Sequence, residues 1–127
     1  MAHDGQNMTS ESTAIFPDLL HVTARALLKL EGILEVAVET LRPKVLENGR
    51  VSNELIVKNQ TSVHGLAWLA TYVESLRQMQ KWAVSLNSDG SFGEIEKLIH
   101  QIAFGEYLGQ VSGGIPMSQS EIVRLQY

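Results

Sequence analysis

The chain has 127 residues, contains no cysteine and carries a formal net charge of −4. This length suits one small domain, and the lack of cysteine excludes disulfide scaffolds, thiol catalysis and cysteine-ligated metal sites. The acidic balance argues against a nucleic-acid partner, which requires a concentrated basic surface. Because no apolar run approaches the ~20 residues that cross a bilayer, we expect a cytoplasmic protein without a membrane partner.

The N-terminal part of the chain is polar and lacks an apolar period. Residues 1–14 are therefore predicted to be a disordered leader. Residues 15–127 are predicted to form a single helical bundle domain.

The first helical pattern begins at Pro17, because a residue without an N–H is favoured in the first turn of a helix. Its apolar or small residues are spaced mostly by three and four, as in the seam of a bundle helix. Pro43 is expected to end or kink this helix, and Asn48-Gly49 is a turn or helix-stop signal. The seam residues are Leu20, Leu27, Leu30, Leu34, Ala37 and Leu41.

The second pattern is predicted to begin at a cap on Ser52 or Asn53 and to run to about Leu86. Every step along its seam is three or four, which favours one long, straight helix packed along its length. Its polar members indicate either a solvated end or a buried polar contact that fixes register. The seam residues are Leu55, Asn59, Ser62, Leu66, Leu69, Val73, Leu76, Gln80 and Ala83.

The third pattern follows a turn at residues 87–90 and runs to about Ser112. Ser91 and Glu94 have the spacing of a capping box, in which the serine caps the helix and the glutamate reaches back to it. Residues 113–116 break this helix.

A second capping box at residues 118–121 predicts a short helix that runs to the C-terminus. The sequence contains no alternating strand pattern. It therefore predicts an all-α fold, an antiparallel helical bundle of three long helices plus a short C-terminal helix.

The third helix is apolar on two opposite faces, and a helix of this kind needs a covering layer on both. Either the first helix wraps around to cover both faces, or a second subunit or another protein segment covers one of them. The two sets are Ile95, Leu98, Ile99 and Ile102 on one face, and Phe104, Leu108 and Val111 on the other.

Gly105, Gly109 and Gly113 repeat every four residues along one stripe of the same helix. Since glycine costs a helix about 1 kcal/mol relative to alanine, the repeat indicates that another backbone comes close there. A ligand lying against the bare backbone is the second interpretation. The predicted interface or packing residues are Phe104, Gly105, Tyr107, Leu108, Gly109, Val111 and Gly113.

Glu106 lies near the isoleucine face and is expected to be partly buried. A buried carboxylate requires a partner, and His64, His100 or an arginine is the expected one. A structural ion pair or hydrogen bond is expected for this residue, and a catalytic role is the alternative. No catalytic motif, cofactor fingerprint or di-iron pattern is present, so no catalytic, cofactor-binding or metal-binding residue is assigned.

Two stretches carry a resemblance to a known family. The first is residues 64–79, HGLAWLATYVESLRQM, and the second is residues 92–124, which ends in GGIPMSQSEIVR. Together they resemble the N-terminal extension of the acyl-CoA dehydrogenase family, in particular the (2S)-methylsuccinyl-CoA dehydrogenase type. The similarity covers roughly Leu19 to Arg124 and is strongest after Val63.

This resemblance implies a parent enzyme that oxidises the acyl chain of a coenzyme A thioester. In that family FAD takes a hydride from the β-carbon, a carboxylate removes the α-proton, and an electron-transfer flavoprotein accepts the electrons. No residue of this chain matches the catalytic carboxylate or the flavin contacts. Leu125 also stands where relatives are expected to have a proline before the flavin-binding body begins.

The resemblance therefore implies a non-catalytic accessory domain without a cofactor of its own. Its expected partner is the catalytic body or a second copy of itself, in a homodimer or larger assembly. A stand-alone helical oligomerisation or protein-interaction module is one alternative. An acyl-CoA-binding helical bundle, with a pocket beside Gly105 and Gly109, is the other.

Overall fold

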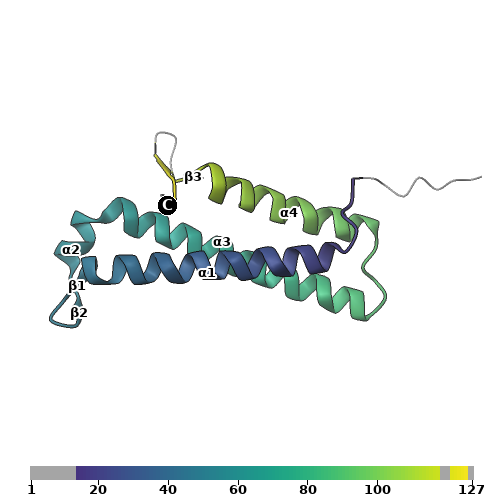
Figure 1. Cartoon of the computed structure of the whole chain (residues 1–127), viewed down its shortest axis with the longest axis horizontal. Coiled ribbons are helices and arrows are strands. Elements are labelled where there is room, and N and C mark those ends of the chain that lie inside the picture. Colours follow the sequence, from purple (N-terminus) through teal and green to yellow (C-terminus); the bar gives the residue numbers. More distant parts are fainter. Residues whose placement is uncertain (1–13, 118–120, 126–127) are drawn as a thin grey trace, which may run out of the picture.

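The computed structural model of the chain describes residues 14–117 and 121–125, so the predicted leader lies outside the described residues except for Ala14. Three long helices pack side by side in antiparallel succession (Figure 1), and the predicted all-α bundle is confirmed. The helices are α1 (Leu19–Val45), α2 (Asn53–Lys58), α3 (Gln60–Ser88) and α4 (Glu94–Gly113). The strands are β1 (Leu46–Glu47), β2 (Arg50–Val51), β3 (Ile115–Pro116) and β4 (Ile122–Val123).

Helix α1 begins two residues after the predicted start at Pro17. Asp18 has a φ of 55°, and its carbonyl accepts the first helical hydrogen bonds. Pro43 falls in the last turn, and the helix ends two residues beyond it. Asn48 and Gly49 then have φ values of 51° and 75°, the pair of positive φ angles that a tight hairpin turn between β1 and β2 requires. The predicted turn at this dipeptide is confirmed.

The predicted single helix from Ser52 to about Leu86 is interrupted at Asn59, between α2 and α3. Ser52 caps α2 as predicted, by accepting a hydrogen bond from a backbone N–H of the first turn. The side-chain amide of Asn59 donates to the carbonyl of Leu55 at 2.9 Å and to that of Lys44 at 3.3 Å. Asparagine side chains of this kind compete with the helical backbone for partners, and here the competition ties the break to the end of α1.

Helix α4 begins at Glu94, two residues later than a cap on Ser91 predicts, and the capping box does not form. Gly93 occupies the N-cap position and no side chain caps the helix. Glu94 is therefore the first helical residue, whereas a capping box would need it three positions after the cap. The N–H of Gly93 instead donates to the carbonyl of Ser91.

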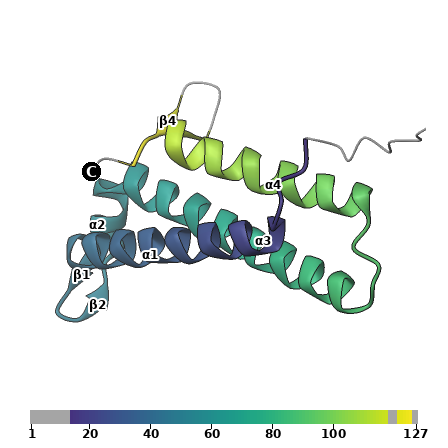
Figure 2. The same cartoon turned by 45° about the vertical axis from the view of Figure 1, so that its right-hand side comes forward.

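The predicted short C-terminal helix is wrong where the structure describes that segment, and residues 118–120 lie outside the described residues. Ile122 and Val123 form β4, which pairs antiparallel with β3. Gly114, with a φ of 134°, turns the chain out of α4, and β4 reaches the start of α3 (Figure 2). A Cβ placed on Gly65 of α3 would lie 2.8 Å from Val123, so glycine is required for this approach.

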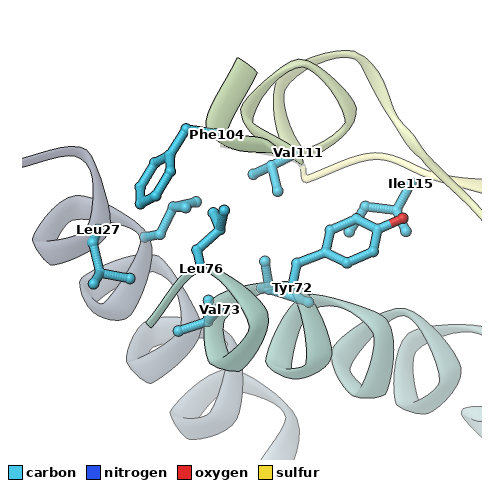
Figure 3. Packing of buried hydrophobic residues seen from close by; sticks show 9 residues of the cluster. Leu27, Tyr72, Val73, Leu76, Phe104, Val111 and Ile115 are labelled. Carbon is cyan, nitrogen blue, oxygen red and sulfur yellow. The ribbon is translucent and has the colours of Figure 1, made fainter. Parts of the chain in front are cut away.

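The core lies between the three long helices (Figure 3), and each of them contributes buried apolar side chains. A fully buried leucine or phenylalanine stabilises a fold by about 1.5–3 kcal/mol, so this cluster determines how the helices pack. A smaller cluster of Leu19, Ala83 and Phe92 closes the other end. The main cluster consists of Leu27, Leu30, Leu69, Tyr72, Val73, Leu76, Phe104, Val111 and Ile115.

Candidate functional site

The side of α4 that faces away from α1 and α3 is apolar and exposed. Ile95, Ile99 and Ile102 expose 70%, 49% and 62% of their surface. Steps of three and four residues continue the same line through three exposed glycines, so all six positions lie on one stripe of the helix. We call this surface the α4 outer stripe, and it consists of Ile95, Ile99, Ile102, Gly105, Gly109 and Gly113.

The glycine half of the outer stripe is bare backbone. A Cβ added at any of the three glycines would meet no heavy atom within 4 Å. The close approach of another backbone, which the repeat predicts, is therefore not made within the described part of this chain. Each glycine costs a helix about 1 kcal/mol relative to alanine. The close backbone contact that would explain this cost therefore remains a prediction, to be made by a partner.

The opposite face of α4 packs inside the bundle. Phe104 and Val111 are 2% and 6% exposed, and Tyr107 and Leu108 pack against the same cluster. Phe104 and Val111, which the sequence predicts as interface or packing residues, therefore pack within the bundle. The sequence shows two apolar faces on this helix, but it does not show which of them α1 and α3 cover.

Tyr107 also contacts Tyr72 of α3, with ring centroids 4.6 Å apart. The Tyr72 hydroxyl donates to the side chain of Gln110, which links α3 to the last turns of α4. Burial raises the pKa of the Tyr72 hydroxyl, and the neighbouring Tyr107 raises it further. The Tyr72 phenol is therefore neutral, and its contacts with Tyr107 and Gln110 link α3 to α4.

Glu106 and His64 are both exposed, so the predicted burial of these two residues is wrong. Nε2 of His64 accepts a hydrogen bond from the indole of Trp68 at 3.1 Å, one turn along α3. Glu106 lies on the line of the outer stripe, between Ile102 and Gly109, on the solvent side of α4. The imidazole is therefore paired within its own helix and not with this carboxylate.

Two buried polar side chains carry a network that the sequence reasoning missed. Thr23 and His100 are 4% and 0% exposed. Oγ1 of Thr23 lies 2.9 Å from Nε2 of His100 and 2.7 Å from Oε1 of Gln80. The one sign of this network in the sequence is Gln80, a polar residue in the apolar seam of α3. Of the two interpretations of such residues, the structure supports a polar contact between helices for Gln80. By contrast, Ser62 is exposed.

Two hollows lie on the described surface away from the outer stripe. One hollow of about 430 Å³ lies at the start of α1 beside Phe92 and Lys97. Another, of about 440 Å³, lies between the end of α1, the β1–β2 hairpin and Leu66. Neither hollow is lined by a glycine of the outer stripe. Within residues 14–117 and 121–125, no three His, Asp or Glu side chains come together as a metal site would require.

None of the helices described here is both long enough and apolar enough to cross a membrane.

Comparison with known proteins shows that this bundle is homologous to a part of an acyl-CoA dehydrogenase. One relative is (2S)-methylsuccinyl-CoA dehydrogenase of Cereibacter sphaeroides, which is 52% identical over 109 residues. The match covers 86% of this chain and 20% of the relative, so the chain spans about a fifth of the length of that enzyme. No family model matches the chain. The resemblance seen in the sequence is thus confirmed as a likeness to one domain of such an enzyme.

Proposed function

We propose that the chain is a non-catalytic helical accessory domain of an FAD-dependent acyl-CoA dehydrogenase. In this proposal the α4 outer stripe packs against the flavin-binding body of the enzyme. The observation that carries the proposal is an unburied apolar stripe on a domain that matches one fifth of a dehydrogenase. Contiguous exposed apolar surface marks interaction sites, and covering it yields roughly 25 cal/mol per Å².

The two halves of the stripe suit a helix of the partner. The isoleucines offer apolar side chains for packing, while the bare glycines allow a second backbone to approach closely. Glu106 follows Ile102 by four residues and precedes Gly109 by three, so this exposed carboxylate lies on the same stripe. A docked segment would therefore have to offer the carboxylate a hydrogen-bond donor or a positive charge, because burying it unpaired is costly.

The parent reaction would oxidise the acyl chain of a coenzyme A thioester at FAD, which the enzyme class implies. The residues described here do not fit a flavin site. Both hollows are open surface features, whereas a flavin requires an enclosed cleft with convergent polar groups. We therefore assign flavin binding and catalysis to the remainder of the enzyme and derive no step of the reaction in this chain.

The direct test is reconstitution with a flavin-binding body. The Cereibacter sphaeroides enzyme without the matched segment is mixed with this chain, and complex formation is followed by size-exclusion chromatography with light scattering. We expect a complex that Ile99→Asp abolishes, because a carboxylate that replaces one of the three apolar side chains of the stripe would be buried unpaired. Leu28→Asp is the matched control, since Leu28 lies on α1 and is 68% exposed. A body that ignores the chain, or equal damage from both variants, contradicts the proposal.

A second copy of the chain is the alternative occupant of the same stripe. Sedimentation velocity at increasing concentration separates the two cases, because self-association that Ile99→Asp removes would favour the oligomerisation module. An acyl-CoA-binding bundle has less support, since neither hollow lies beside Gly105 or Gly109. Calorimetry with coenzyme A thioesters that shows no heat would remove that alternative.

A further inference from the structure

His100 lies where the three long helices meet. The ring is completely buried on α4, Nε2 bonds to Thr23 of α1, and Thr23 bonds to Gln80 of α3. The rings of Phe92 and Phe104 flank it at 6.0 Å and 4.8 Å between centroids. One titratable side chain therefore links α4 to both of the other long helices.

The hydrogen bonds define which nitrogen of the ring carries the proton. The amide nitrogen of Gln80 donates to the carbonyl of Leu20 at 3.0 Å, so its oxygen faces Thr23. That oxygen and the carbonyl of Leu19, which lies 3.0 Å from Oγ1 of Thr23, can only accept, so the single hydroxyl hydrogen of Thr23 points to one of these two oxygens and not to His100. Nε2 of His100 therefore donates its hydrogen to Thr23, and Nδ1 is an unprotonated acceptor.

Nδ1 has no hydrogen-bond partner among the described residues, although it is buried. The groups that face the ring from α1 and α3 are the uncharged side chains of Thr23 and Gln80. Two charged side chains lie on the preceding turn of α4. Glu96 is directed toward Gly93, and Lys97 lies over the Phe92 ring at 5.9 Å. A proton on Nδ1 would thus lack both an acceptor and a compensating charge.

We propose that His100 is an acid-sensitive lock that holds α4 against α1 and α3. Helix α4 buries three residues, His100, Phe104 and Val111, whereas α3 buries six. The titratable ring is thus a large share of what holds this helix in place. Protonation would put a charge into an apolar site, and releasing α4 would return the ring to water.

The direction of the pH effect follows from linkage. Burial lowers the pKa of His100 in the folded chain below its ordinary value of 6.5. Well above pH 6.5 the ring is neutral in both states and the lock is intact. As the pH falls below 6.5, the released state takes up the proton first, and its population rises by up to about tenfold per pH unit until the folded pKa is reached.

Hydrogen exchange of the full chain at pH 7.5 and 5.5, corrected for intrinsic rates, tests this proposal. We expect amides of α4 to lose protection at pH 5.5 before those of α1 and α3. His100→Gln should remove this difference, because its amide can still donate to Thr23 and does not titrate. His21→Gln, at an exposed position on α1, should leave the difference unchanged.

Protection of α4 that is equal at both pH values would overturn the lock, and so would a pH effect that persists in His100→Gln. An NMR titration of the wild-type chain gives a measurement that requires no variant to fold. We expect a His100 pKa below 6.5 and release of α4 over the same range. A pKa at or above 6.5 would contradict the proposal.

Discussion

The two faces of α4 both carry large apolar side chains, but one face is buried and the other is exposed. The inner face, with Phe104 and Val111, is covered by α1 and α3, while Ile95, Ile99 and Ile102 on the outer stripe expose between 49% and 70% of their surface. The difference shows that an apolar pattern reports how many faces must be covered, but not which of them the chain itself covers. We therefore expect the inner face to determine the stability of this bundle and the outer stripe to determine its binding.

The largest expected effect is a loss of stability when a side chain of the inner face is removed. Phe104→Ala should destabilise the chain by about 3–5 kcal/mol, because it removes a buried ring and leaves a cavity. Ile102→Ala, on the outer stripe of the same helix, should change the stability by no more than about 0.5 kcal/mol. Chemical denaturation of the isolated chain measures both. Similar losses in the two variants would show that the outer stripe is also part of the core.

The polar link between the helices should give an intermediate effect. Thr23→Val leaves Gln80 and His100 without their shared partner, and a buried group without a partner costs about 1–3 kcal/mol. Thr40→Val on the same helix is the matched control, since the Thr40 hydroxyl bonds an exposed backbone carbonyl one turn earlier. Thermal unfolding of both variants is the measurement. An unchanged midpoint for Thr23→Val would mean that the network does not contribute to stability.

The smallest expected effect comes from the glycines of the outer stripe, where one substitution should raise the stability of the chain and weaken its binding. Gly109→Ala should stabilise the isolated chain by about 0.4–1 kcal/mol, since alanine favours a helix and finds open space there. The same variant should weaken binding to the flavin-binding body, where the proposed partner helix needs the bare backbone. Gly32→Ala on α1, which is also in open space, should stabilise the chain and leave binding unchanged. Parallel denaturation and binding experiments measure both effects, and unchanged binding by Gly109→Ala would remove the glycines from the interface.

Much of the fold could be predicted from the sequence because helical periodicity and caps are local signals. The cap at Ser52, the Asn48-Gly49 turn and the end of α4 needed no knowledge of the tertiary structure. The break at Asn59 could not be predicted in the same way, because one of its partners is a carbonyl at the end of α1. The β3–β4 pair likewise depends on a contact between Val123 and Gly65, far apart in the sequence.

The candidate site was predicted in part. The glycine stripe and the isoleucine face are both visible in the sequence, but there they are separate features, and Phe104 is grouped with the glycines as an interface or packing residue. Only the packing of α4 shows that the glycines and isoleucines form one exposed surface. The buried network was missed because a lone histidine such as His100 carries no pattern of its own.

The most direct test of the central claim is hydrogen exchange of this chain with and without the flavin-binding body of the Cereibacter sphaeroides enzyme. We predict that binding protects amides along residues 95–113 of α4 while the exposed side of α1 around Leu28 stays unchanged. Protection confined to α1 or to the β1–β2 hairpin, or no protection at all, would contradict the assignment of the α4 outer stripe as the docking surface.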